Sequence, residues 1–133
     1  MLLAQPGSKV AAVPEVEHDE SIAAHWRDFA RQHADTLQGQ CTDLPNVSIF
    51  RGQFVTLYVV KTPDPLELTD PGVGCEIFLL NATHVGSIPL APNTLGMRAV
   101  RAFGPEGELL SDEVITFPQA QLSVPVGGFV RIA

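Results

Sequence analysis

From about residue 44 onward, the chain consists of short apolar runs separated by turn residues. The runs are rich in β-branched and aromatic residues and are bounded by Pro, Gly, Asn or Asp, a pattern typical of strands with tight connections. We predict strands near 47–50, 53–61, 66–68, 75–81, 85–89, 95–103, 109–117, 120–124 and 129–132. Seven to nine short strands without alternating helices predict a mainly β, antiparallel sandwich or barrel and exclude a parallel α/β sheet.

The run 53–60 is apolar on both faces of the strand it predicts. Val55, Leu57 and Val59 point one way, while Phe54, Thr56 and Tyr58 point the other, because successive side chains of a strand alternate. We therefore expect this strand either to be central or to be covered on its second face by a helix.

The pattern of residues 20–38 differs and predicts one amphipathic α-helix. Its apolar positions recur at steps of three and four and include the only tryptophan. The stripe comprises Ile22, Trp26, Phe29, Ala30, His33 and Leu37. Such a face must be covered, either by the protein's own sheet or by a neighbouring subunit.

The chain divides into two parts in this interpretation. Residues 1–43 form an N-terminal arm and the helix, since Pro6 and Pro14 interrupt the first segment. Residues 44–133 form one β-sandwich that ends in a C-terminal hairpin, with a turn at Gly127. At 133 residues, a single domain with appendages is expected.

Charge and hydropathy exclude two classes of partner. The formal net charge is −7 and the 8 Lys and Arg residues are scattered, so we expect no nucleic-acid partner, which requires a basic surface. The sequence lacks an apolar run of about 18 residues, so we expect no membrane insertion. The apolar start at residues 1–4 is too short for a signal peptide, and no export is expected.

A family resemblance appears in the segment 96–114. Val100-Arg101-Ala102, a turn at Gly107 and then Ser111 and Val114 resemble the last hairpin of fibronectin type III and bacterial immunoglobulin-like domains. The runs 74–79 and 85–88 are similar to their middle strands, so the resemblance covers about residues 44–118. It implies an immunoglobulin-like sandwich. This chain departs from the pattern because its tryptophan lies in the helix and a further hairpin follows.

Few residues have the spacing that catalysis or metal binding requires. His84 is the candidate base that would activate Ser87 or Cys75 as a nucleophile. The GxSxG pattern typical of a serine nucleophile is missing around Ser87, so we do not expect this role. His25 and His33 are too far apart on a helix to share an ion. We expect no catalytic residue, no metal and no cofactor.

Two local questions stay open at the level of sequence. Asp64, Glu67 and Asp70 form an oxygen-rich loop that either holds calcium or is simply solvated. Cys41 and Cys75 are either a disulfide or two ordinary thiols.

These observations favour a non-enzymatic structural protein that acts through protein–protein contacts. The leading hypothesis is a bacteriophage virion accessory component, either a capsid decoration (cement) or a tail protein, whose partners are other proteins or copies of itself in a capsid or tail shell. The expected interface residues are Ile22, Trp26, Phe29 and Phe129. The alternatives are a secreted or cell-surface immunoglobulin-like adhesion module and a small ligand-binding barrel or enzyme.

Overall fold

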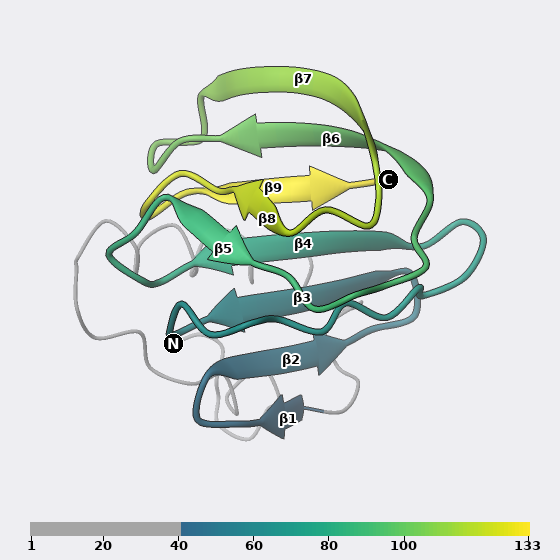
Figure 1. Cartoon of the computed structure of the whole chain (residues 1–133), viewed down its shortest axis with the longest axis horizontal. Helices are drawn as coiled ribbons and strands as arrows, with labels where there is room; N and C mark the ends of the chain where they lie inside the picture. Colours follow the sequence, from purple (N-terminus) through teal and green to yellow (C-terminus); the bar gives the residue numbers. More distant parts are fainter. Residues whose placement is uncertain (1–40) are drawn as a thin grey trace.

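A computed structural model describes residues 41–133, which form nine strands (Figure 1). The predicted arm and helix, with Ile22, Trp26 and Phe29, lie outside the described residues. The strands are β1 Cys41–Asp43, β2 Val47–Arg51, β3 Val55–Val60, β4 Glu76–Asn81, β5 Ser87–Pro89, β6 Met97–Phe103, β7 Leu109–Thr116, β8 Gln121–Ser123 and β9 Phe129–Ile132. The predicted mainly β class is confirmed, and this part of the chain contains no helix.

Most predicted strands are present, with two differences. Residues 41–43 belong to the predicted N-terminal part, yet they form β1, in which Asp43 pairs with Ser48 of β2 at the edge of the sheet. The Asp43 carboxylate also accepts hydrogen bonds from Ser48 Oγ at 2.6 Å and Lys61 Nζ at 2.8 Å. The predicted strand 66–68 is reduced to a single parallel bridge between Leu66 and Leu90.

Seven strands form one mixed sheet in the order β1-β2-β3-β4-β9-β6-β7, and β5 and β8 form a second, two-stranded sheet. The prediction of an all-antiparallel sandwich is wrong at β3 and β4, which are parallel, with Leu57 opposite Phe78. Parallel neighbours need a long crossover, and residues 61–75 supply it without a helix. An immunoglobulin sandwich divides its strands between two antiparallel sheets, so this distribution of strands differs from the expected one.

The predicted C-terminal hairpin is also wrong. β8 pairs with β5 in the small sheet, whereas β9 lies between β4 and β6 in the large one. The turn at Gly127 exists and has a positive φ of 75°, but it connects two different sheets. β9 occupies this position because it carries Val130 and Ile132 into the core and completes the hydrogen bonding of both neighbours.

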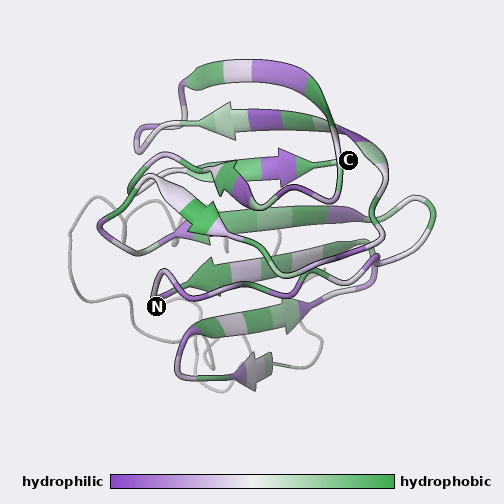
Figure 2. Cartoon of the chain, viewed as in Figure 1, coloured by the Kyte–Doolittle hydropathy of each residue, from purple (hydrophilic) through white to green (hydrophobic). Residues whose placement is uncertain are grey.

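The main core lies between the large sheet and a layer formed by the small sheet and the long connections. In Figure 1, β5 and β8 lie in front of the middle of the large sheet. Colouring by hydropathy shows apolar middle strands and more polar outer strands β6 and β7 (Figure 2). The core residues are Val47, Ile49, Tyr58, Val60, Leu66, Leu68, Ile77, Leu79, Ile88, Leu90, Leu95, Val100, Ala102, Phe117, Leu122, Val124, Val130 and Ile132.

β3 is a central strand, and both of its faces are buried, in agreement with its pattern. Tyr58 and Val60 point into the main core. Leu57 and Val59 point to the opposite face of the sheet, which we call the second face. By register, this face also carries Phe78, opposite Leu57.

Asn81, at the end of β4, is a fully buried polar residue that joins three segments. Its Nδ2 donates hydrogen bonds to the carbonyl oxygens of Val85 and Val124, both at 2.8 Å. Its Oδ1 accepts from the Thr83 amide at 2.9 Å and the Thr83 hydroxyl at 2.7 Å. Since the whole side-chain amide is used internally, Asn81 is a structural residue.

Candidate functional site

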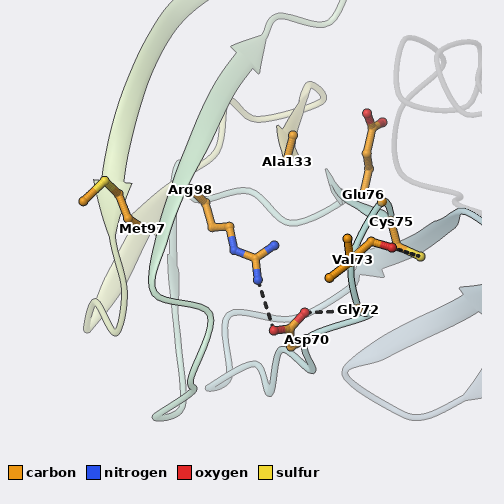
Figure 3. A pocket seen from close by; sticks show the side chains of 9 residues that line it. Asp70, Gly72, Val73, Cys75, Glu76, Met97, Arg98 and Ala133 are labelled. Carbon is orange, nitrogen blue, oxygen red and sulfur yellow. Dashed lines mark hydrogen bonds and ion pairs between the residues drawn. The ribbon is translucent and has the colours of Figure 1, made fainter.

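An open hollow of about 540 Å³ lies at one end of the large sheet (Figure 3). It is formed by the loop before β4, the beginning of β6 and the C-terminus. Its lining residues are Asp70, Gly72, Val73, Gly74, Cys75, Glu76, Met97, Arg98 and Ala133. In Figure 3, Arg98 extends across the hollow toward Asp70, while Met97 and Val73 lie on opposite sides.

The loop that borders the hollow is shaped by two glycines. Gly72 and Gly74 both have positive φ, at 102° and 81°, which side-chain-bearing residues rarely adopt. The amide of Cys75 donates to the Gly72 carbonyl at 3.3 Å and closes the turn. This turn projects Val73, between the two glycines, fully into solvent.

A salt bridge connects this loop to β6. Arg98 Nη2 and Asp70 Oδ2 are 3.1 Å apart, and Arg98 Nε donates to the Leu95 carbonyl at 2.8 Å. The Gly72 amide donates to Asp70 Oδ1 at 2.9 Å. This amide lowers the pKa of Asp70 below its usual range; desolvation opposes the shift, and the Arg98 guanidinium lowers the pKa by a smaller amount.

The lowered pKa of Asp70 predicts a pH dependence. A carboxylate whose pKa is lowered on folding stabilises the fold above its ordinary pKa, and this stabilisation is lost as the pH falls through the lowered value. Between about pH 5 and pH 2, the unfolding free energy of Asp70→Asn should therefore fall less steeply than that of the native chain. Urea unfolding over this pH range checks the prediction, and parallel curves for the two proteins would contradict it.

The second face of the sheet carries ion pairs on its β4, β9, β6 and β7 side. The Arg131 guanidinium binds the Glu76 carboxylate through two nitrogens, with Nε to Oε1 at 3.1 Å. Arg101 Nε lies 3.4 Å from Asp112 Oδ2, and both side chains are about half exposed. An exposed pair such as Arg101 and Asp112 adds little stability.

Of the nine large apolar side chains that are exposed in the described residues, five lie on the outer strands β6 and β7 or beside the hollow. Met97 is 70% exposed and Val114 is 65% exposed, and both lie on the second face. Leu109 and Leu110 are exposed at the other end of β7, and Val73 is exposed across the hollow. We call Val73, Met97, Leu109, Leu110 and Val114 the outer apolar set.

β7 is also an edge strand. Among the described strands it pairs only with β6, so its other edge presents backbone N–H and C=O groups to a further strand. The opposite edge, β1, has three residues, whereas β7 runs over eight. β7 is therefore the longer edge available for strand addition.

The two nucleophile candidates donate to groups that are not bases. Ser87 Oγ donates its proton to Gln121 Oε1 at 2.6 Å, across the β5 and β8 pair. The Cys75 thiol donates toward the carbonyl oxygens of Gln53 and Val73, which are not bases. His84 is exposed in the turn after β4.

The acidic loop does not converge on an ion position. Asp64 accepts from the Thr62 hydroxyl at 2.7 Å, Asp70 pairs with Arg98, and Glu67 is exposed. Residues 41–133 contain no group of three His, Cys, Asp or Glu side chains placed to hold a metal.

The two cysteines are separate thiols in this structure. Burial and, secondarily, the neighbouring Asp43 carboxylate raise the pKa of Cys41.

Phe129, an expected interface residue, lies on the second face and stacks on Phe103 with ring centroids 4.7 Å apart. Sequence reasoning did not nominate the outer apolar set, because alternation alone does not show which strand lies at an edge.

Comparisons with known proteins give no relative from which a function could be inferred. No protein-family model, curated protein or solved structure matches this chain. Within residues 41–133, no helix has the length and apolar character needed to cross a membrane. The class that the fold and the site define is a mainly β domain with exposed apolar and edge-strand surfaces.

Proposed function

We propose that this protein is a non-enzymatic assembly component that acts through protein–protein contacts. The observation that carries the proposal is the outer apolar set, which lies along the strands β6 and β7 and beside the hollow. Apolar side chains that gather on one part of a surface favour association, because contact removes them from water. A partner strand on the β7 edge would add main-chain hydrogen bonds to that gain.

The charges of β7 suit a selective contact. Asp112 and Glu113 lie in the middle of this strand, between the apolar residues at its two ends. Charged residues on an edge oppose indiscriminate pairing with other strands. A partner must therefore supply complementary basic groups as well as an apolar surface, which gives specificity.

The particular assembly we propose is a bacteriophage virion, with this chain as a capsid decoration or tail protein. A small acidic β domain with its contact residues on an edge suits repeated addition to a capsid or tail shell, or to copies of itself. The immunoglobulin-like relationship remains a proposal for the β6 and β7 hairpin. The mixed sheet argues against extending it unchanged to the whole domain.

The virion proposal has a direct test. Particles purified from the organism that carries the gene should contain this chain in a fixed ratio to a shell protein, as measured by quantitative mass spectrometry. Capsid, portal or tail genes should flank its own gene. Finding the chain in the medium or on the cell surface, and absent from particles, would refute the proposal.

The contact surface has a separate test in the double variant Met97→Asp/Val114→Asp. Both side chains are largely exposed, so the fold should remain, whereas two new carboxylates should oppose burial of this surface in a contact. We expect incorporation into particles to fall at least tenfold, as measured by co-sedimentation. Phe54→Asp is the matched control, because Phe54 is 54% exposed and lies outside the outer apolar set. Equal incorporation of all three proteins would exclude this surface.

A further inference from the structure

The apolar part of the second face is buried, although the described layer lies on the other side of the sheet. Leu57 is 1% exposed, Val59 is 0% exposed and Leu80 is 2% exposed. None of the three belongs to the main core, whose covering residues come from the small sheet and the connections. Apolar side chains in the middle of a sheet face are removed from water only by a second covering layer.

The buried patch has a defined extent. By register it runs across β2, β3 and β4, and the half-buried ring of Phe129 borders it on β9. Beyond this ring, the charged pairs of β9, β6 and β7 begin. Four strands at about 4.8 Å spacing give a patch about 14 Å wide, which suits one helix. Its buried members are Phe50, Val55, Leu57, Val59, Phe78 and Leu80.

The chain itself offers an occupant of matching chemistry. Residues 20–38 have a single apolar stripe that contains Ile22, Trp26 and Phe29, and a helix of this length spans about 28 Å. Contact between these apolar aliphatic and aromatic side chains would remove both surfaces from water.

The connection to β1 is short and limits where such a helix can lie. Only Gly39 and Gln40 separate residue 38 from Cys41, so three Cα steps of about 3.8 Å give a reach of at most about 11 Å. The side chain of Cys41, opposite Phe50 in the register, lies on the second face. The helix would therefore end beside the edge of the buried patch.

We propose that residues 20–38 form a helix that packs on the second face of their own chain. Ile22, Trp26 and Phe29 contact the patch around Leu57, Phe78 and Leu80. The expected interface residues, including Phe129, then form an internal interface, and the outer apolar set is left for partners. This proposal does not depend on the proposed function.

Nuclear Overhauser measurements on the full chain test the contact directly. Trp26 is the only tryptophan, so its indole protons are unambiguous, and they should show cross-peaks to the methyl groups of Leu57 or Leu80. A mixture of labelled and unlabelled chains distinguishes contact within one chain from contact between two. Cross-peaks only between chains would show that a second copy supplies the helix, and the absence of cross-peaks would exclude the contact. Either result overturns the proposal.

Tryptophan fluorescence provides a second measurement. In the native chain, Trp26 should emit at a shorter wavelength than in urea, at every protein concentration. Phe29→Asp should shift this emission to the unfolded position while the circular dichroism of the β-sheet is retained. Gln32→Asp is the matched control, because Gln32 lies on another face of the helix, and its emission should stay native. If Phe29→Asp keeps the native emission, the proposal is wrong. If Phe29→Asp unfolds the sheet, the nuclear Overhauser cross-peaks of Trp26 in the native chain determine whether the helix contacts the second face.

Discussion

Replacing Asn81 with alanine is expected to lower the free energy of unfolding by about 3 kcal/mol, because it leaves several buried polar groups without partners. The carbonyl oxygens of Val85 and Val124 each lose a hydrogen bond of 2.8 Å. The amide and hydroxyl of Thr83 lose their acceptor. Asn81 is fully buried, so water cannot replace these bonds without opening the structure.

Urea unfolding of the two proteins measures this effect. Asn93→Ala is a suitable control, because Asn93 makes similar local contacts, to Leu95 N at 3.1 Å and Ala91 O at 3.4 Å, but is only half-buried. We expect the control to cost about 1 kcal/mol or less. Equal losses for the two variants would show that the network around Asn81 is no more important than an ordinary turn.

Gly128→Ala is expected to destabilise the fold by at least about 2 kcal/mol, because the added methyl group has no space. A Cβ at this position would lie 2.1 Å from the Phe103 carbonyl oxygen and 3.1 Å from the Cα and carbonyl carbon of Gly104. These contacts are with backbone, which cannot move aside like a flexible side chain. The start of β9 would have to move away from β6, which would disturb the pairing of Phe103 with Phe129.

The thermal midpoint of Gly128→Ala gives the measurement, with Gly86→Ala as the matched control. A Cβ at Gly86 would meet only the Val124 carbonyl oxygen, at 4.0 Å, which is ordinary contact. The control should therefore change the midpoint little. Similar midpoints for both variants and the native chain would mean that β9 can shift without cost.

Asn81 and Gly128 are joined by backbone hydrogen bonds, so the effects of the two substitutions on the free energy of unfolding should not add. The Asn81 amide donates to the Gly128 carbonyl at 3.0 Å, and the Gly127 amide donates to the Asn81 carbonyl at 3.0 Å. Residues that share a hydrogen-bond network have effects that do not add. These hydrogen bonds connect the end of β4 to the start of β9. They align two neighbouring strands that contribute side chains to both the main core and the second face.

The pattern of residues by itself predicted eight of the nine strands in residues 41–133, all except β1, and the alternation of their side chains. The run at β3 was apolar on both sides, and the strand is central with both faces buried. Turn residues at 104–107 and at Gly127 marked chain reversals that exist. Such features are local, because they depend on period, on β propensity and on the conformational freedom of glycine.

Only the tertiary structure decided which strands are neighbours, and that decision defines the candidate site. Arg98 and Asp70 are 28 residues apart, and no local pattern predicts that the parallel β3 and β4 crossover brings them together. In the same way, the sequence predicts that β8 and β9 form a hairpin, but the two strands belong to different sheets. β9 lies between β4 and β6, where Val130 and Ile132 are buried and the backbone groups of both neighbouring strands are hydrogen-bonded. The edge position of β7, which carries Val114 and pairs with the strand of Met97, follows from this strand order. Strand order reflects the packing of the whole core, which no short segment encodes.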